Sequence, residues 1–390
     1  KLDKTGAIID ESSLRSSINY FARPAYDNGM VIVPLAGGAL QAIRASDMET
    51  LWLAEAMKYL DWDPETFEPL YYDLENLSSL YIKDGFVYSA SSAFSDFDPF
   101  GGIVRSVDMT TGRTQWIQDI SGGFYWSGPV EILDHLLIAG EDGILRALDT
   151  KTGDELAQLD IGSKVRSTLV KVDDYIFFTD IEGNLNKVKF DTENTLFSEH
   201  EKINFSEKST STPSILAGKA YVGGDNIFAI IDIDSMTVNQ TFDLNGSVQS
   251  TPLVLQGNED ELNVYFTLNN ENGLLYVYDG QVVEVAYEPG EDAKNYTVAS
   301  PIVDQDGNIY YTNDSGYIFT LADIAEEVVE TETELTSKPS EQALIEGEDP
   351  DTGTADSQDK GIPAVIIYSS LAFVLLVVII LWLRKRKKVN

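Results

Sequence analysis

Few residues in this 390-residue chain are placed to carry out chemistry. A serine nucleophile needs a histidine that a carboxylate holds in place. The two histidines, His135 and His200, lie in the segments LDHLL and FSEHEK, and neither has a nucleophile motif beside it. We interpret both as solvated loop residues. The chain has no cysteine, which excludes thiolate metal sites, cysteine nucleophiles and disulfides. The sequence therefore predicts no catalytic residue.

One segment has oxygen ligands at alternate positions, as a calcium-binding loop does. Asp304, Asp306 and Asn308 lie in the sequence DQDGN. No glutamate follows at the spacing that an EF-hand loop requires, and a tight hairpin turn accounts for the same residues. We favour the turn and keep calcium as the alternative, with no metal ligand assigned.

Two segments rich in aromatic and acidic residues are the best candidates for a contact surface. They are residues 58–76 (KYLDWDPETFEPLYYDLEN) and residues 89–100 (SASSAFSDFDPF). Loops on a rigid scaffold are favoured sites of recognition. The alternative is that their aromatic side chains pack over the open edges of the first two repeats. The predicted contact residues are Trp62, Tyr71, Tyr72, Phe94 and Phe97.

The elements that must position these residues form a repeat of about 40 residues. Each copy contains an apolar strand, a turn rich in Gly or Asn, a second strand, a strand ending in A-x-D, a T-G turn and a last strand. The clearest copies are GGIVRSVDMTTGRTQW (residues 101–116) and GEDGILRALDTKTGDEL (residues 140–156). Four short strands per copy are typical of a β-propeller blade. We predict an all-β fold over residues 1–323, a seven-bladed β-propeller of four-stranded antiparallel blades. The seven copies begin near Ala22, Leu77, Trp126, Arg166, Ser211, Ser250 and Ala299.

The two ends of this region predict how the ring closes. The seventh copy stops after three strands, at Asp323, whereas residues 2–10 (LDKTGAIID) have the D-x-T-G pattern of the missing turn and outer strand. We predict that this N-terminal strand completes the last blade. The alternative is that residues 2–10 are a linker left from an upstream domain.

The pattern A-x-D-x-x-T-G-x-x-x-W resembles the tryptophan-docking repeat of the PQQ-like (quinoprotein-type, BamB-like) β-propellers over about residues 2–323. It is clearest at Asp108, Gly112 and Trp116, and again at Asp149 and Gly153. The family that this pattern resembles includes dehydrogenases, which have a larger ring, an adjacent cysteine pair near the quinone, and calcium beside a catalytic aspartate. This chain has no cysteine and seven repeats rather than eight. We therefore expect no cofactor, and PQQ least of all.

The charge of the chain limits its partners. Before the basic cluster at residues 384–388 there are 22 basic and 64 acidic residues. Such a body repels nucleic acid phosphates and anionic lipid headgroups, so nucleic acid is excluded. We expect a non-catalytic, monomeric binding or scaffolding module that contacts an extracellular protein or a carbohydrate through its loop faces. The alternative class is an enzyme, either a quinoprotein-type oxidoreductase or a glycan-active propeller.

The C-terminal part predicts a membrane anchor. Residues 324–361 contain 12 acidic and 2 basic residues, which is typical of an extended, disordered stalk. Residues 362–383 carry no charge over 22 positions, enough for one transmembrane helix. The basic tail at residues 384–390 places the C-terminus in the cytoplasm and the large N-terminal domain outside. The alternative is cell-wall anchoring, because DPDTG (residues 349–353) before this span resembles a sortase signal, although its first residue is not Leu.

Overall fold

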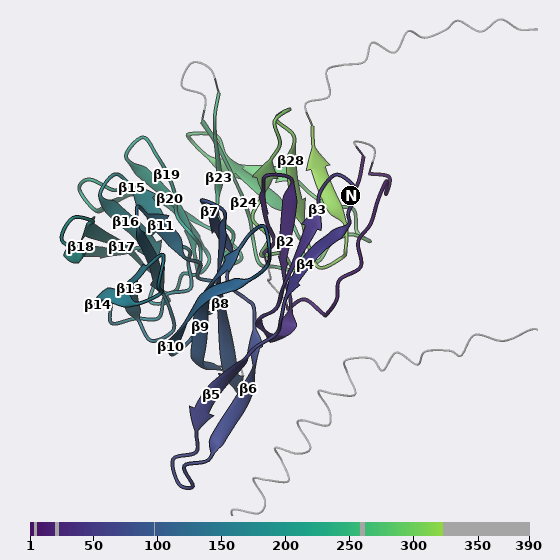
Figure 1. Cartoon of the computed structure of the whole chain (residues 1–390). Helices are drawn as coiled ribbons and strands as arrows, with labels where there is room; N and C mark the ends of the chain where they lie inside the picture. Colours follow the sequence, from purple (N-terminus) through teal and green to yellow (C-terminus); the bar gives the residue numbers. More distant parts are fainter. Residues whose placement is uncertain (4–5, 20–22, 97, 258–261, 323–390) are drawn as a thin grey trace, which may run out of the picture. The chain divides into compact units, whose positions relative to one another are not determined.

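The computed structural model describes residues 1–3, 6–19, 23–96, 98–257 and 262–322 of the chain. Over these ranges the chain forms seven antiparallel β-sheets in sequence order (Figure 1). Five sheets have four strands in simple meander order, one has six strands and one has three. The all-β prediction is confirmed, since the one helical element in the described ranges is a short 3-10 turn, η1 (Ala36–Gly38).

The first sheet contains β1 (Ala25–Asp27), β2 (Met30–Pro34), β3 (Leu40–Arg44) and β4 (Thr50–Ala54). The second contains β5 (Lys58–Trp62), β6 (Pro69–Glu75), β7 (Tyr81–Lys83), β8 (Phe86–Ser95), β9 (Asp98–Asp108) and β10 (Thr114–Ser121). The third contains β11 (Val130–Ile132), β12 (His135–Ala139), β13 (Ile144–Asp149) and β14 (Glu155–Asp160). The fourth contains β15 (Val170–Val172), β16 (Tyr175–Thr179), β17 (Asn184–Asp191) and β18 (Leu196–Asn204).

The fifth sheet contains β19 (Ser214–Leu216), β20 (Lys219–Gly224), β21 (Ile227–Asp232) and β22 (Thr237–Asp243). The sixth contains β23 (Leu253–Gln256), β24 (Leu262–Thr267), β25 (Leu275–Tyr278) and β26 (Val283–Tyr287). The seventh contains β27 (Ile302–Val303), β28 (Ile309–Thr312) and β29 (Ile318–Leu321).

The hydrophobic core lies between successive sheets rather than in one centre. The middle strands are covered on both faces, so every residue of β12 is buried, whereas residues of the outer strand β14 alternate between exposed and half-buried. One core cluster joins Leu137 and Leu145 of the third sheet to Ile176 and Phe178 of the fourth. Similar clusters join the other consecutive sheets, so the second to sixth sheets each bury one face against the sheet before and the other against the sheet after.

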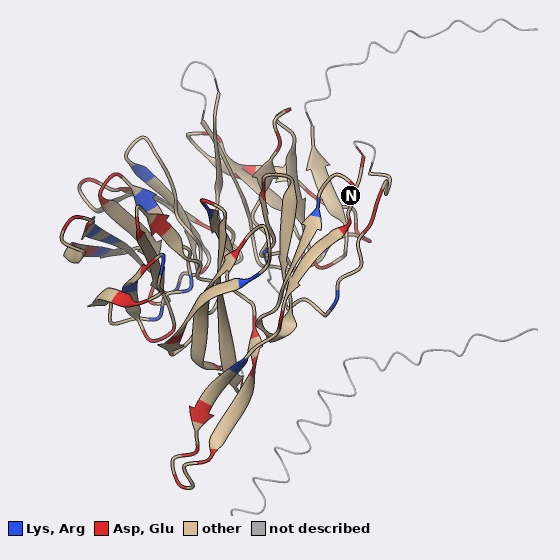
Figure 2. Ribbon diagram, in the orientation of Figure 1, with Lys and Arg blue, Asp and Glu red and all other residues tan. Residues whose placement is uncertain are grey.

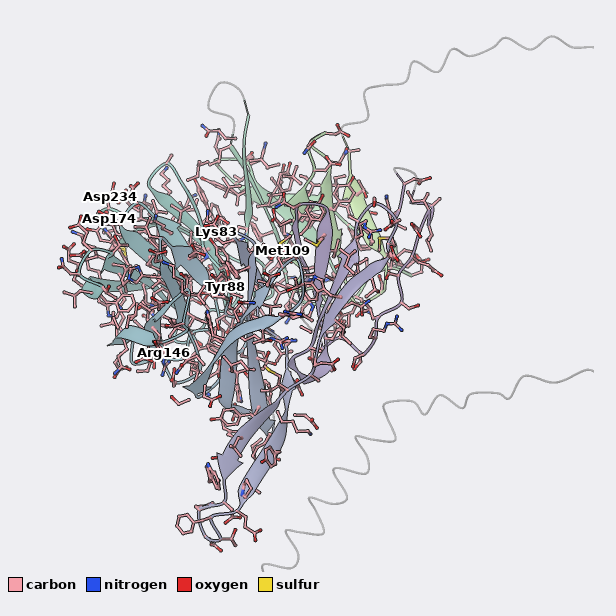
Figure 3. All side chains as sticks on the ribbon, in the orientation of Figure 1. Lys83, Tyr88, Met109, Arg146, Asp174 and Asp234 are labelled. Carbon is pink, nitrogen blue, oxygen red and sulfur yellow. The ribbon has the colours of Figure 1, made fainter. Side chains whose placement is uncertain are left out.

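The tryptophan of the repeat connects one sheet to the next. Trp52 Nε1 donates a hydrogen bond to the backbone oxygen of Met109 at 2.8 Å (Met109 is labelled in Figure 3), and Trp116 Nε1 donates to Thr150 O at 2.8 Å. A Cβ atom added at Gly153 would lie 2.5 Å from the Trp116 ring. The glycine of the T-G turn is needed because an indole from the preceding sheet packs on it.

Hydroxyl groups make the corresponding connections among the later sheets. Thr179 Oγ1 donates to Ser211 O at 2.8 Å, Ser211 Oγ donates to Ser250 O at 2.7 Å, and Thr267 Oγ1 donates to Ala299 O at 2.8 Å. These bonds join the fourth sheet to the fifth, the fifth to the sixth and the sixth to the seventh. Ser211, Ser250 and Ala299 each stand two residues before a proline, so the recurring small-x-Pro pattern marks the segments through which successive sheets are joined.

The aspartate of the repeat forms the turn after the third strand. Asp108 Oδ1 accepts hydrogen bonds from the Thr110 amide at 3.0 Å, the Thr111 amide at 2.8 Å and the Thr111 hydroxyl at 2.9 Å. The Thr111 hydroxyl bond, followed by the Thr111 amide bond, lowers the pKa of Asp108. Asp149, Asp191, Asp232 and Asp279 close equivalent turns. The A-x-D part of the motif is thus a structural turn signal.

The predicted closure of the ring by residues 2–10 stays a prediction. Among the described residues of that segment, Leu2 forms an antiparallel bridge with Ile8 across the turn. Asp3 stabilises this local turn, because its backbone amide donates to Ala7 O and its carboxylate accepts from the Ala7 amide, both at 2.9 Å. The sheet of β27, β28 and β29 has three strands in the described part of the chain.

The C-terminal predictions lie outside the described residues. The stalk (324–361), the apolar segment (362–383) and the basic tail (384–390) all follow residue 322. Within the described ranges, no helix has the length and apolarity needed to cross a membrane.

Candidate functional site

The predicted insertion at residues 58–76 forms a two-stranded hairpin, β5–β6, which we call the arm (residues 58–75). It extends away from the sheets in Figure 1. The pairs Leu60↔Tyr71 and Trp62↔Pro69 lie on one side of the arm, and the pair Tyr59↔Tyr72 lies on the other. Trp62 and Tyr71 are 56% and 64% exposed. One face of the arm therefore presents aromatic and aliphatic side chains to solvent.

The opposite face of the arm is held against the second sheet. Tyr72 makes an edge-on contact with Phe100, with ring centroids 4.8 Å apart, and Tyr59 does the same at 5.8 Å. A Cβ atom at Gly101 would lie 2.3 Å from the Tyr59 ring, so the close approach requires glycine there. Burial, followed by the nearby Asp61 carboxylate, raises the pKa of Tyr59. The apolar outer face is consequently displayed on a base fixed by aromatic packing.

The five predicted contact residues have different environments. Trp62 and Tyr71 are exposed on the arm, as a contact surface requires. Tyr72 is half-buried against Phe100, and Phe94 packs against Tyr125 at 6.0 Å. Phe97 lies outside the described residues. The segment 89–100 is also less of a loop than expected, because most of it extends β8 and β9.

A second feature, which sequence reasoning missed, is a pair of adjoining cavities of about 510 and 370 Å³ that share Trp126 and Gln249 in their linings. We call this hollow the axial mouth. Its walls come from the segments before the first strands of six sheets, represented by Arg23, Trp126, Arg166, Lys208, Gln249 and Ala299. Segments so far apart in sequence meet in one hollow because the sheets surround a common axis.

The arm and the axial mouth lie on the same face. In an antiparallel four-stranded meander, the connection leading into the first strand lies at the same end as the turn between the second and third strands. The lining of the axial mouth consists of such connections and turns. The arm lies in the chain between β4, the last strand of the first sheet, and β7, which begins the meander β7–β10 of the second sheet. The turn between β8 and β9 joins the second strand of that meander to the third.

The lining of the axial mouth is richer in basic residues than the rest of the protein. Figure 2 shows Asp and Glu on many of the outer loops, and the whole chain carries 64 acidic and 27 basic residues. The lining of the two cavities instead contains four basic residues, Arg23, Lys164, Arg166 and Lys208, and two acidic residues, Asp225 and Asp314. Glu141 and Asp98 pair with Lys164 and Arg166, so an anionic group is best accommodated at the cations that have no such partner.

One buried carboxylate organises part of this charge. The Glu141 carboxylate accepts hydrogen bonds from Arg166 Nε at 2.7 Å and from Arg166 Nη2 at 2.8 Å. Its Oε2 also lies 3.3 Å from Lys164 Nζ. The Arg166 guanidinium also lies over the Tyr125 ring, 4.5 Å from its centroid. Lys164 Nζ also lies 3.9 Å from Asp98 Oδ1. The two cations of this cluster therefore face two carboxylates and are balanced by them.

The other two cations are not neutralised by any carboxylate of the described ranges. Arg23 is half-buried, its Nη1 lies 3.5 Å from Ser79 Oγ, and burial lowers the pKa of its guanidinium. Lys208 is exposed at the rim. Trp126, which lines both cavities, has φ +66°, an uncommon conformation for a bulky residue.

The interpretation of the two histidines as solvated loop residues was wrong, because both lie in strands. His135 lies in β12, where it is buried, and its Nε2 is 3.0 Å from Thr195 Oγ1. His200 lies in β18 with its Nε2 2.9 Å from Asn186 Oδ1, and burial, followed by the charge of Lys202, lowers its pKa. Both side chains pack inside the fold. An imidazole can be buried at an inward-facing strand position when it has a hydrogen-bond partner, as both histidines have.

The DQDGN segment forms a turn, as we favoured. Asp304 accepts hydrogen bonds from the Asp306 and Asn308 amides, the Asn308 side chain and the Tyr310 hydroxyl. The side-chain bond from Asn308 and the other bonds lower the pKa of Asp304 to about 2, against an opposing effect of burial. Its carboxylate is occupied by the turn itself. In the described ranges, no group of three or more His, Cys, Asp or Glu is arranged to hold a metal ion.

Comparisons with known proteins agree with this architecture. A model of the family described as outer membrane protein assembly factor BamB matches residues 101–349. BamB from Moraxella catarrhalis is similar in structure, with a TM-score of 0.54 and 17% identity over 76% of this chain and 80% of that one. A chain of a mitotic checkpoint complex has a TM-score of 0.55 and 11% identity over 79% of this chain and 89% of its own. None of the curated proteins matches the sequence. The chain is a β-propeller that belongs to the family of the outer membrane protein assembly factor BamB.

Proposed function

We propose that this protein is a non-catalytic binding or scaffolding module that recognises another protein through the exposed face of the arm. The observation that carries the proposal is the row of Leu60, Trp62 and Tyr71, which are 43%, 56% and 64% exposed on one side of the hairpin. Phe67, in the turn of the arm, is 76% exposed. Contiguous exposed apolar side chains are typical of interaction sites, and Trp, Tyr and Phe are enriched at protein–protein interfaces.

The arm is built as a docking element rather than as a flexible loop. Its inner face is fixed by Tyr59 and Tyr72 against Phe100, so the outer aromatic rings are held in place before a partner arrives. Preorganisation of this kind reduces the entropy lost on binding. Membership of a family described as an assembly factor supports a scaffolding role over a catalytic one.

The proposal includes the finer architecture and the location. The seven sheets form a seven-bladed ring, supported by the meeting of segments from six sheets at the axial mouth. The propeller lies outside the cytoplasmic membrane, anchored by residues 362–383 with the basic tail inside. This is supported by the uncharged span and the basic residues after it. The intact mass of the mature protein tests the anchor, since sortase cleavage after Thr352 would remove the span.

Site-specific photocrosslinking tests the recognition surface. Benzoylphenylalanine placed at Trp62 or Tyr71 of the full-length protein in its native cells should give an adduct with one discrete protein. Leu133 provides the matched control: it is 71% exposed and lies in the turn between β11 and β12, at the opposite end of the sheets. Equal crosslinking from position 133, or adducts with glycan alone, would refute protein recognition by the arm.

A further inference from the structure

We propose that the axial mouth is a binding site for a carboxylate group of an acidic peptide segment. This inference deepens the proposed function, because it names a second contact that a protein partner docked on the arm would make. It rests on the cations of the axial mouth, on the apolar wall beside them and on the shared face with the arm.

The cations come from separate segments and line the two adjoining cavities, Arg23 the larger one and the other three the smaller one. Arg23 precedes the first sheet, Arg166 and Lys164 precede the first strand of the fourth, and Lys208 precedes that of the fifth. Arg23 is half-buried and has no carboxylate partner among the described residues; the polar contact that the structure gives it is the long one to Ser79 Oγ. Holding a guanidinium partly out of water without a counter-charge is costly, and a ligand carboxylate would supply that charge through charge-assisted hydrogen bonds.

The shape of the site favours a peptide over a small inorganic anion. The larger cavity, about 510 Å³, contains Pro24, Val298 and Ile302 in its wall as well as Arg23 and Trp126. A single phosphate or sulfate would leave this apolar wall uncovered. A peptide segment with an acidic residue next to an apolar one matches both parts of the lining, since apolar side chains gain by leaving water and the carboxylate gains by meeting the cations.

The location of the axial mouth makes simultaneous contact with the arm feasible. Both features are built from connections on the same face of the sheets. A partner whose apolar surface is bound to the outer face of the arm could place a second segment in the axial mouth. Because that partner is already bound, the second contact is effectively intramolecular and forms even when it is weak by itself. The two contacts remain separable by mutation, because they use different residues.

Fluorescence anisotropy on the full-length protein in detergent tests the site. The probe is a fluorescein-labelled hexapeptide of alternating Glu and Leu, and the comparison peptide alternates Lys and Leu. The acidic peptide should bind and the basic one should not, with affinity falling as NaCl rises. Lys208→Glu should weaken the acidic peptide about tenfold or more, equivalent to about 1.4 kcal/mol, and Arg23→Gln should weaken it to a similar extent.

Two controls make the result decisive. Lys83→Glu makes the same charge change at the end of β7 next to the opposite turn (Lys83 is labelled in Figure 3), and it should leave binding unchanged. Trp62→Ala should also leave the peptide affinity unchanged, so loss of arm-dependent crosslinking alone would refute the proposed function and not this site. Equal weakening by Lys83→Glu would show nonspecific charge attraction and overturn the proposal. So would full competition by millimolar inorganic phosphate, which would assign the site to small anions, or no binding of the acidic peptide.

Discussion

The arm and the boundary between the second and third sheets each contain a tryptophan, yet the two residues have opposite roles. Trp116 is buried, donates its indole N–H to Thr150 O at 2.8 Å and packs on Gly153. Trp62 is 56% exposed on the outer face of the arm. A large aromatic ring buried between sheets stabilises the fold, whereas the same ring left in solvent on a fixed hairpin is available to a partner. Residue type alone does not distinguish these roles; the environment does.

The largest predicted effect tests this comparison directly. Trp116→Ala should lower the free energy of unfolding by about 3–5 kcal/mol, because it removes a buried aromatic side chain and leaves a cavity. Trp62→Ala should change it by less than about 0.5 kcal/mol, as expected for an exposed position. Urea denaturation of the two variants measures the difference. Equal destabilisation by both would mean that the arm is part of the core and not a recognition element.

A smaller effect is expected from the glycine on which Trp116 packs. Gly153 and Gly162 have φ of +79° and +78°, but only at Gly153 does an added Cβ meet other atoms, 2.5 Å from the Trp116 ring. Gly162→Ala should cost about 1–2 kcal/mol, the price of a left-handed conformation for alanine. Gly153→Ala should cost about 1–3 kcal/mol more, because the ring must move. If thermal melting shows the same loss for both variants, the indole does not dock on the T-G turn.

The smallest effect is a dependence on pH at the turn of the seventh sheet. Hydrogen bonds to the charged form lower the pKa of Asp304 to about 2, below the value of about 3.9 for an unfolded aspartate. Its contribution to stability is therefore present above about pH 4 and is lost as the pH falls toward 2.

Asp304→Asn should reduce the melting temperature slightly at pH 7, and the gap from the native protein should narrow as the pH falls from about 4 toward 2. Glu284→Gln on β26 removes a charge from a side chain that is exposed in the structure and serves as the control. A gap that stays constant from pH 7 to pH 3 would contradict the pKa assignment.

The success of the sequence-based predictions varied with the range of the interactions involved. Asp108, Gly112 and Trp116 act through a turn or through the next sheet, and a motif that recurs at fixed spacing records such contacts. In residues 2–10 the same motif forms a local turn in which Asp3 pairs with Ala7, whereas closure of the ring by this segment depends on contacts beyond the turn and stays a prediction. His135 and His200 were misplaced because an acidic or turn-like neighbourhood in sequence does not show which strand positions face inward.

The two parts of the candidate site differ in the same way. The arm is one continuous segment, so its aromatic residues were visible together, and only the division into the exposed Trp62 and Tyr71 and the packed Tyr72 awaited the register of β5 and β6. The axial mouth combines single residues from six sheets. The one available signal was the small-x-Pro pattern, which marks the segments leading into first strands but not the cations among them.

The amino-acid order by itself determined the all-β repeat, its turns, the inter-sheet tryptophans and the family, because each depends on contacts within one copy or between adjacent copies. The tertiary structure alone decided that Arg23, Arg166 and Lys208 share one hollow, and that Trp62 faces solvent while Trp116 does not. The physical reason is that closing sheets around an axis brings together residues far apart along the chain, and no local pattern encodes which of them meet.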